Sequence, residues 1–324
     1  MKKKSGVMPT RLRLIILFAL MLFSVSTIKA TGIPFQKPGE PSIEGRWDMT
    51  INVAGKELPS WLEVVHSGTH RLIGQYVGPG GSARPISRVN FKDGKMSFTI
   101  PPQWEQEDND IVVEGTLNGD NLSGTIIASD GKTYNWVAQR APSLWRKNPP
   151  VWGKPIKLFN GKNLDGWHAM GPNQWVAENG ILRSPKPGSN LVTDETFNDF
   201  KLHIEFRYPK ESNSGVYLRG RYEIQVADNK GMEPLKIYFS GIYGFIAPIE
   251  MTAKDPGEWQ SFDVTLVGRI VTLVANGKTV ICEQQIPGIT GGAINSKEGE
   301  PGPILLQGDH GTIEYRNIVI TPAK

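Results

Sequence analysis

The sequence contains a single cysteine, Cys282, among its 324 residues. A lone cysteine cannot form a disulfide within the chain, so the fold must be held together by burial of its core. Cys282 lies in the run Thr-Val-Ile-Cys-Glu, which has the composition of a strand. We expect it to be a small core residue rather than a nucleophile.

The sequence also lacks any long stretch with a helical period after its N-terminal segment. Asn-Gly and Asp-Gly pairs, which favour tight hairpin turns, recur instead between apolar alternations. They are Asp93-Gly94, Asn118-Gly119, Asp130-Gly131, Asn160-Gly161, Asn179-Gly180 and Asn276-Gly277. The pattern predicts an all-β protein.

Long hydrophobic stretches are scarce, and the clearest one extends from Leu14 to Val25. Lysines and arginines precede it and small residues follow it, which is typical of a secretory signal peptide over residues 1–30. Since the run is short for a bilayer span, we expect cleavage near Ser26 or Ala30 and no stable membrane insertion afterwards. The expected location is the periplasm or the exterior of a bacterium. An uncleaved membrane anchor is the alternative.

The sequence also has no excess of positive charge outside residues 1–30. The whole chain has 36 Lys and Arg against 32 Asp and Glu, but residues 1–30 hold six of the basic residues and none of the acidic ones. The remainder has 30 basic and 32 acidic residues, a net charge near −2. The charge balance gives no support for nucleic-acid binding.

A proline-rich linker at residues 141–157 separates two regions of the chain. Residues 43–140 contain eight short alternating runs, which predict a small up-and-down β-barrel. Residues 158–324 predict a second domain, a two-sheet jelly-roll sandwich. We expect the barrel to be dispensable for any chemistry, and the glycine-rich segment 78–85 to be a plain turn.

The second domain centres on the stretch from Asp199 to Asp228. Apolar and polar residues alternate in it over residues 200–207, 216–219 and 222–226, which predicts strands with one buried face. If these strands pair, polar side chains crowd one sheet face, namely Glu205, Arg207, Tyr217, Arg219, Glu223 and Gln225. Such a face suits a polyhydroxylated ligand. The alternative is the solvated face of an antiparallel sheet.

Eight motifs in order give the second domain a family resemblance over about residues 155–322. They are Leu-Phe-Asn-Gly-Lys-Asn-Leu-x-Gly-Trp, Asp-Phe-x-Leu-x-x-Glu-Phe-Arg, Asn-Ser-Gly-Val-Tyr-Leu-Arg, Tyr-Glu-Ile-Gln-Val-x-Asp, Gly-x-Tyr-Gly, Gly-Glu-Trp, Leu-Leu-Gln and Tyr-Arg-Asn-Ile. Together they resemble the 3-keto-disaccharide hydrolase domain family. The resemblance implies a concanavalin-like jelly roll, export, and action on a glucoside or disaccharide oxidised at C3.

A ketone at C3 acidifies the proton on C2, and its removal gives an enolate that can expel the C1 substituent before water adds. This chemistry needs a base, an acid and a donor to the C3 oxygen. The candidate acid-base residues are Glu223, Asp228, Glu205 and His310. The candidate substrate-binding residues are Arg207, Asn213, Tyr217, Arg219, Gln225, Tyr243, Trp259 and Gln307. Which carboxylate is the base stays open, and a divalent metal could replace an arginine at the enolate.

Two other functions stay open. The run Glu223-Ile-Gln225-Val-Ala-Asp228 resembles the catalytic strand of laminarinase-type retaining glycosidases, although Gln225 stands where those enzymes have a carboxylate. A noncatalytic carbohydrate-binding protein would instead use exposed aromatic side chains.

Overall fold

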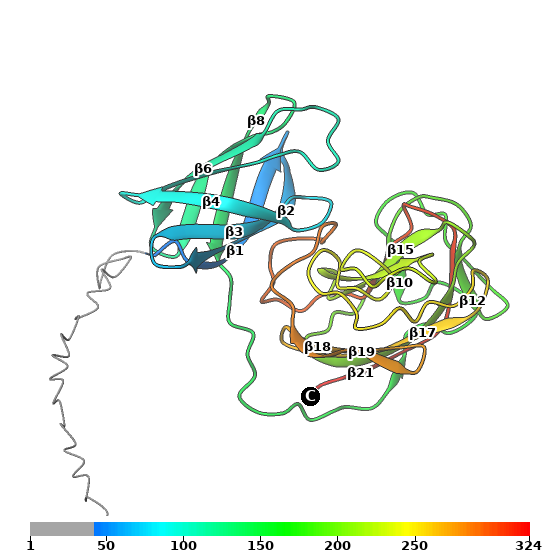
Figure 1. The fold of residues 1–324 in the computed structure, drawn as a ribbon. Coiled ribbons are helices and arrows are strands. Elements are labelled where there is room, and N and C mark those ends of the chain that lie inside the picture. Colours follow the sequence, from blue (N-terminus) through cyan, green and yellow to red (C-terminus); the bar gives the residue numbers. More distant parts are fainter. Residues whose placement is uncertain (1–41) are drawn as a thin grey trace, which may run out of the picture. The chain divides into compact units, whose positions relative to one another are not determined.

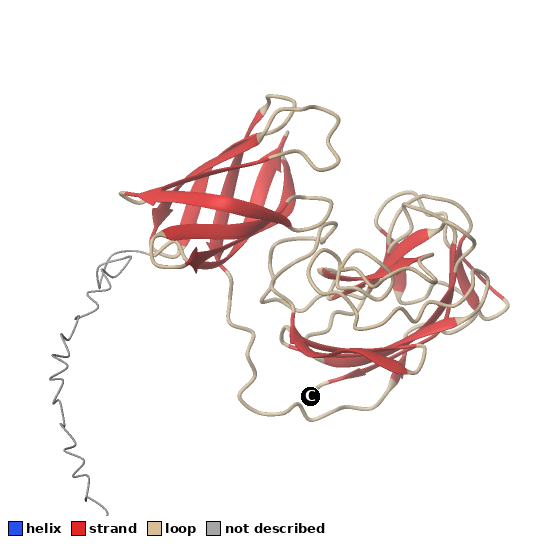
Figure 2. Cartoon of the chain, in the orientation of Figure 1, coloured by secondary structure: helices blue, strands red, loops and turns tan. Residues whose placement is uncertain are grey.

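The computed structural model describes residues 42–324, and the predicted signal peptide lies outside the described residues. All regular elements of this part of the chain are strands, as Figures 1 and 2 show. The predicted all-β class is confirmed. Residues 42–324 contain no helix that is long and apolar enough to cross a membrane.

The first eight strands form a closed barrel in which each strand pairs with its neighbours in sequence and β1 pairs with β8. They are β1 (Gly45–Val53), β2 (Lys56–Ser67), β3 (Arg71–Val77), β4 (Arg84–Lys92), β5 (Lys95–Ile100), β6 (Ile111–Asn118), β7 (Asn121–Ile127) and β8 (Thr133–Arg140). The barrel interior is filled by side chains such as Trp47, Phe98 and Trp136, all nearly fully buried. The eight-strand barrel agrees with the sequence prediction.

The remaining strands form two sheets. The five-stranded sheet has the order β10 (Trp167–Ala169), β13 (Leu191–Thr193), β20 (Leu305–Leu306), β15 (Asn213–Leu218) and β16 (Tyr222–Ala227). The eight-stranded sheet has the order β11 (Val176–Glu178), β12 (Ile181–Ser184), β21 (Ile313–Pro322), β14 (Phe200–Arg207), β17 (Gln260–Val267), β18 (Ile270–Ala275) and β19 (Lys278–Gln285), and β9 (Ile156–Lys157) pairs with β21. The predicted jelly-roll sandwich is therefore confirmed.

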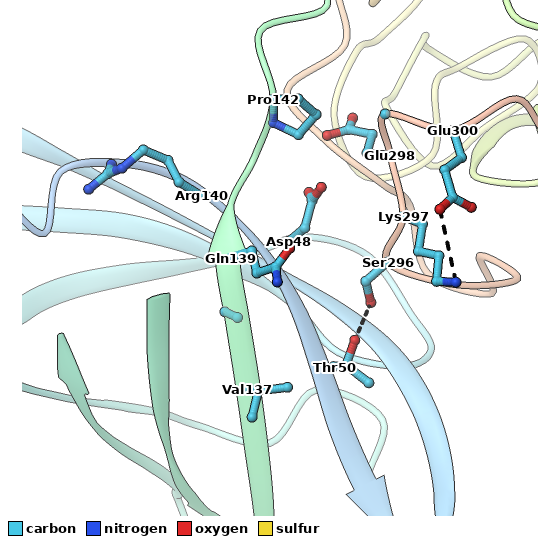
Figure 3. Close-up of a pocket in the computed structure, with 12 residues that line it drawn as sticks. Asp48, Thr50, Val137, Gln139, Arg140, Pro142, Ser296, Lys297, Glu298 and Glu300 are labelled. Carbon is cyan, nitrogen blue, oxygen red and sulfur yellow. Dashed lines mark hydrogen bonds and ion pairs between the residues drawn. The ribbon is translucent and has the colours of Figure 1, made fainter. Parts of the chain in front are cut away.

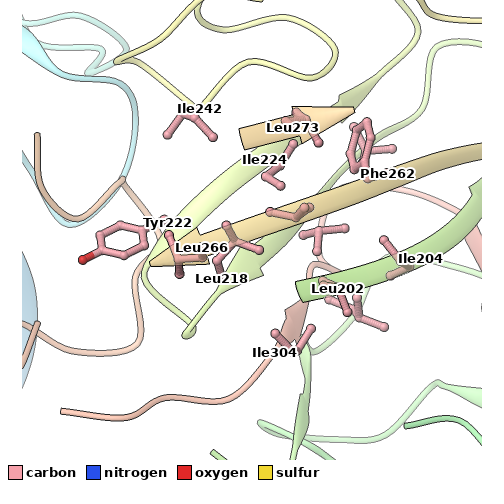
Figure 4. Packing of buried hydrophobic residues seen from close by; sticks show 14 of the residues in the cluster. Leu202, Ile204, Leu218, Tyr222, Ile224, Ile242, Phe262, Leu266, Leu273 and Ile304 are labelled. Carbon is pink, nitrogen blue, oxygen red and sulfur yellow. The ribbon is translucent and has the colours of Figure 1, made fainter. Parts of the chain in front are cut away.

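The core of the sandwich lies between these two sheets (Figure 4). Ile204 of β14 and Phe262 of β17 come from the eight-stranded sheet, whereas Leu218 of β15 and Ile224 of β16 come from the five-stranded sheet. All four side chains are fully buried. Burial of this kind stabilises the fold by about 1.5–3 kcal/mol for each large apolar side chain. No disulfide is needed.

The conditional pairing of the three central strands holds for the second and third strands and is wrong for the first. β14 pairs with β17 and β21, whereas β15 pairs with β16 and β20. Glu205 and Arg207 of β14 therefore lie in the eight-stranded sheet, apart from Glu223 and Gln225 of β16. Alternation fixes which side chains share a face of one strand, but it does not fix which strands pair.

The expected burial of Cys282 is also wrong, because its side chain is exposed. The pairing of β18 with β19 shifts register at two places between Val271 and Val274. Val280 and Ile281, adjacent in sequence, are both buried, so the strict alternation assumed for this strand fails. A bulge that buries two successive residues leaves the next one facing solvent.

Candidate active site

The hairpin of β15 and β16 presents a row of polar side chains on one face. Tyr217 lies opposite Glu223 in the register, and Gly215 lies opposite Gln225. Val216 and Ile224 alternate with them and point into the core. A Cβ at Gly215 would lie 2.5 Å from Oε1 of Glu223, so the glycine makes the room that the carboxyl occupies.

A cavity of about 330 Å³ lies over this face. The polar residues around it are Asn190, Asn213, Tyr217, Glu223, Gln225, Tyr243, Gln307, Asp309 and His310. Its glycine-rich lining comes from Gly291 and Gly292 and from the barrel loop Pro79, Gly80 and Gly81. The structure thus brings six predicted substrate-binding or catalytic side chains around Glu223 itself. Asn213, Tyr217, Gln225, Tyr243, Gln307 and His310 are those six.

Glu223 is a carboxyl group of the cavity whose pKa is strongly raised. Its side chain is buried, and burial raises its pKa from 4.5 to about 8. The hydroxyl of Tyr217 lies 2.9 Å from Oε2 of Glu223 and opposes this rise, as does the nearby His310. A carboxyl with a pKa near neutral pH can both give and take a proton.

His310 is the second titratable group that the prediction placed here. Its Nδ1 lies 2.6 Å from Oδ1 of Asp309, and this hydrogen bond is the main reason that its pKa is raised above 6.5. The charge of Glu223 raises it further. The side chain of His310 is half exposed, in contrast with buried Glu223. The cavity therefore holds a buried acid and an accessible one whose charges stabilise each other.

Three amide side chains in the cavity have buried oxygens with no protein partner. These are Oδ1 of Asn213, Oε1 of Gln225 and Oε1 of Gln307. The amide nitrogen of Gln225 donates to the carbonyl oxygen of Ile237, which fixes the orientation of that amide. Buried acceptors are costly when they are unpaired, so these three oxygens suit a ligand that is rich in hydroxyl groups.

Other candidate residues lie elsewhere. Glu205 accepts hydrogen bonds from Arg316 at 2.6 Å and from Asn317 at 2.8 Å, on the eight-stranded sheet. Arg207 pairs with Glu314, and its guanidinium lies over the ring of Trp259. Glu205, Arg207 and Trp259 therefore belong to a surface network of that sheet, away from the cavity lining.

Arg219 and Asp228 follow the ends of their strands and leave the polar face. Arg219 adopts a left-handed conformation with φ of 52°, and its fully buried guanidinium donates to Tyr222 and to Gly268. Asp228 accepts the backbone N–H of Glu211 at 3.1 Å. Neither lines the cavity, so the predicted roles of Arg219 in substrate binding and of Asp228 in acid-base chemistry do not fit this geometry.

Sequence reasoning missed Asn190, Asp309 and the backbone of Gly291 and Gly292. All four lie in loops or at loop ends, where the sequence has no periodicity that predicts the direction of a side chain. Only Asp309 carried a signal, since it directly precedes His310. The glycine-rich barrel loop was expected to be a plain turn, yet three of its residues line the cavity. Among residues 42–324, no group of three or more His, Cys, Asp or Glu side chains is arranged to hold a metal ion.

A second cavity, of about 490 Å³, includes Asp48 and Glu298 (Figure 3). Burial, with the charge of Glu298 next, raises the pKa of Asp48 to about 8. Glu298 accepts hydrogen bonds from Arg269 at 2.7 Å and from the Tyr222 hydroxyl at 2.6 Å. Because Glu298 is committed to these internal partners, the acid-base pair of the first cavity is the stronger candidate site.

The chain is similar to a curated protein and to solved structures. The sequence of a 3-keto-disaccharide hydrolase from Bacteroides thetaiotaomicron is 22% identical over 165 residues, covering 39% of this chain and 57% of that relative. This chain therefore spans little more than half the length of that curated relative.

Solved structures are also similar. Two come from Parabacteroides distasonis ATCC 8503, and their description as glycosyl hydrolases is provisional. One has a TM-score of 0.44 at 28% identity and covers 54% of this chain and 92% of its own. The other has a TM-score of 0.43 at 26% identity and covers 52% of this chain and 98% of its own.

The family model described as a 3-keto-alpha-glucoside-1,2-lyase-like domain matches residues 154–321, which is more than half of the chain. Its limits agree with those of the eight sequence motifs, and every residue of the cavity outside the barrel loop lies within them. The protein therefore belongs to the 3-keto-alpha-glucoside-1,2-lyase-like domain family.

Proposed function

We propose that the protein cleaves a glucoside or disaccharide whose C3 carries a ketone, by removal of the C2 proton, elimination of the C1 substituent and hydration. The observation that carries the proposal is the presence of buried Glu223 and accessible His310 in one cavity. The family description and the name of the Bacteroides relative support the same class of substrate.

The acid-base roles follow from the two environments. In its ionised form Glu223 is the base that takes the C2 proton, because its pKa of about 8 suits proton transfer near neutral pH. In its protonated form His310 donates to the departing C1 oxygen, because Asp309 stabilises that form. The C2–H electron pair becomes the enolate, and its collapse breaks the C1–O bond.

Binding is assigned to the neutral polar groups of the cavity. The unpaired oxygens of Asn213, Gln225 and Gln307 accept hydrogen bonds from sugar hydroxyls. The hydroxyl of Tyr243 and the amide nitrogen of Asn190 are assigned as donors to the C3 oxygen. The amide of Asn190 is oriented by its own oxygen, which accepts from the backbone N–H of Gly308. In this assignment no arginine stabilises the enolate.

The laminarinase-type alternative gains little support from the geometry. It requires a second carboxylate on the strand of Glu223 about 5 Å away. Gln225 occupies the central position, and Asp228 is turned to the backbone of Glu211. A noncatalytic sugar-binding function would not use the perturbed acid-base pair.

Incubation with methyl 3-keto-glucoside, beside methyl glucoside, separates the three functions. We expect methanol to be released only from the keto sugar. Release from both sugars would identify an ordinary glycosidase, and binding without release from either would identify a noncatalytic binding protein. The Glu223→Gln variant is the control for release that does not depend on the cavity.

We also propose that the protein is exported, on the strength of residues 1–30 alone. N-terminal sequencing of protein from a bacterial host should find a start between Thr27 and Gly32. Soluble cytosolic protein that begins at Met1 would contradict this proposal.

A further inference from the structure

The Tyr217 hydroxyl has two acceptors within reach and one proton to donate. It lies 2.9 Å from Oε2 of Glu223 and 3.1 Å from the carbonyl oxygen of Gly291. A phenol can donate to one of these at a time. Which of the two accepts the hydrogen bond from Tyr217 depends on whether Glu223 is protonated.

The two protonation states of Glu223 therefore favour different hydrogen-bond patterns. Protonated Glu223 can donate to the Tyr217 oxygen, and Tyr217 then donates to Gly291. Ionised Glu223 can only accept, and Tyr217 then donates to the carboxylate. In each pattern the Tyr217 hydroxyl has an acceptor, and the two patterns differ by rotation of one O–H bond.

We propose that Tyr217 is a positioning residue whose hydroxyl turns from the Gly291 carbonyl to the Glu223 carboxylate when Glu223 loses its proton, and so stabilises the basic form of Glu223. This inference rests on the proposed role of Glu223 as the base. It assigns Tyr217 a role toward Glu223, whereas the sequence predicted that Tyr217 binds substrate.

The surroundings of Tyr217 hold its hydroxyl between Glu223 and the backbone of the neighbouring loop. Its side chain is only 2% exposed, and a Cβ on Gly292 would lie 2.6 Å from its hydroxyl oxygen. The backbone therefore closes around the hydroxyl. Burial and the charge of Glu223 raise the pKa of Tyr217 well above 10, so the phenol stays neutral and acts as a donor rather than as a base.

The other groups that face Glu223 are limited in number. Four of them interact electrostatically with Glu223 from the neighbouring loops and from β21, namely Tyr243, Tyr315, Asp309 and His310. Burial raises the pKa of Glu223 most, Tyr217 and then His310 lower it, and Asp309 raises it. Tyr243 and Tyr315 are neutral phenols with raised pKa values. Tyr217 is thus the larger of the two influences that favour the carboxylate.

The test is Tyr217→Phe, which keeps the ring and removes only the hydroxyl. Infrared spectroscopy follows the C=O stretch of protonated Glu223 as a function of pH. This band is identified as the carboxylic-acid band that is present in the parent protein and absent from Glu223→Gln. We expect its midpoint to move upward by about one to two pH units, the size expected for losing a hydrogen bond to a charged group. The acidic limb of C2 exchange in methyl 3-keto-glucoside should shift equally, with a similar plateau at high pH.

Tyr315→Phe is the matched control, because Tyr315 is also a buried phenol but bonds to Ser214 at 2.9 Å. It should leave the midpoint of the Glu223 titration nearly unchanged. An unshifted midpoint in folded Tyr217→Phe, or an equal shift in Tyr315→Phe, would overturn the inference. The infrared titration does not require turnover, so it tests the role of Tyr217 alone. Inactivity of the parent protein toward the keto sugar would contradict the proposed function and not the role of Tyr217.

Discussion

At the scale of single residues, the environment of Glu223 differs from that of an ordinary glutamate. It is a carboxyl on a buried strand, and its hydrogen-bond partner is the neutral phenol of Tyr217 rather than an arginine or a lysine. Burial of a carboxylate without a cation at hydrogen-bond distance is unfavourable. Such a cost is typical of groups that are placed for proton transfer.

This cost predicts how stability depends on pH. The pKa of Glu223 is raised in the folded state from 4.5 to about 8, so folding favours the protonated form. The penalty is absent below about pH 4.5, grows as pH rises through this window, and is complete above pH 8. Glu223→Gln carries no charge, so it should be more stable than the parent at pH 9 by on the order of a few kcal/mol and comparable at pH 4.5.

Urea unfolding at the two pH values checks this prediction. The control is Glu114→Gln, which alters an exposed glutamate of the barrel and should show no such pH-dependent difference. If Glu223→Gln is no more stable than the parent at pH 9, Glu223 does not bear a burial penalty, and its assignment as the perturbed base loses its physical basis.

The sequence predicted part of this site at the residue level. Tyr217, Glu223 and Gln225 could be found because alternation along two strands put them on one face. Asn190 and Asp309 could not, because loop residues have no period that reports where they point. The raised pKa of Glu223 was also beyond sequence reasoning, since it depends on burial by segments distant in the chain.

At the scale of the elements, assignment of strands to sheets decides which polar residues meet. The sequence predicted strands at β14, β15 and β16, but not that β14 belongs to the other sheet of the sandwich. Consecutive strands in a sandwich often cross between sheets, and alternation looks the same in either. Glu205 and Arg207 were therefore grouped with Glu223 although their partners are Arg316 and Glu314.

The sheet assignment leads to a prediction of small effects. Glu205→Gln and Arg207→Met each disrupt a partly exposed ion pair, which contributes about 0–1 kcal/mol to stability. We expect both variants to exchange the C2 proton of methyl 3-keto-glucoside within about twofold of the parent rate. A decrease of 10²-fold or more in the exchange rate, the range typical of a lost general base, would show that these residues take part in the chemistry.

At the scale of the whole molecule, the barrel and the jelly roll, which together make up the described residues 42–324, belong to one compact unit. The backbone N–H of Gly292 donates to the carbonyl oxygen of Pro79 at 3.1 Å, and Trp61 of the barrel packs into the core of the sandwich. These contacts lead us to propose that the barrel completes the cavity, contrary to the expectation that it is dispensable. The boundaries of the two domains as independent folding units stay a prediction.

A single glycine tests the contribution of the barrel. Gly81 has a φ of 76°, and a Cβ on it would lie 1.9 Å from the Trp104 ring. Gly81→Val should therefore displace the loop and lower kcat/KM by about tenfold or more, mainly through KM, because small displacements at a binding wall are costly.

Gly131→Val is the matched control for this variant. Gly131 has a φ of 77° in another barrel turn, and a Cβ on it would meet nothing within 4 Å. Both substitutions carry similar backbone strain, but only Gly81 lines the cavity. Equal kcat/KM for the two variants would show that the barrel loop does not shape the site.

The central claim for the whole molecule is that Glu223 removes the C2 proton of a 3-keto sugar. Hydrogen–deuterium exchange at C2 of methyl 3-keto-glucoside in D₂O, followed by NMR, observes this step apart from departure of the C1 substituent. The parent protein should catalyse exchange at a rate that rises with pH up to about 8, and folded Glu223→Gln should be slower by about 10²–10⁴. Exchange by Glu223→Gln at the parent rate would contradict the account and place the base elsewhere in the cavity.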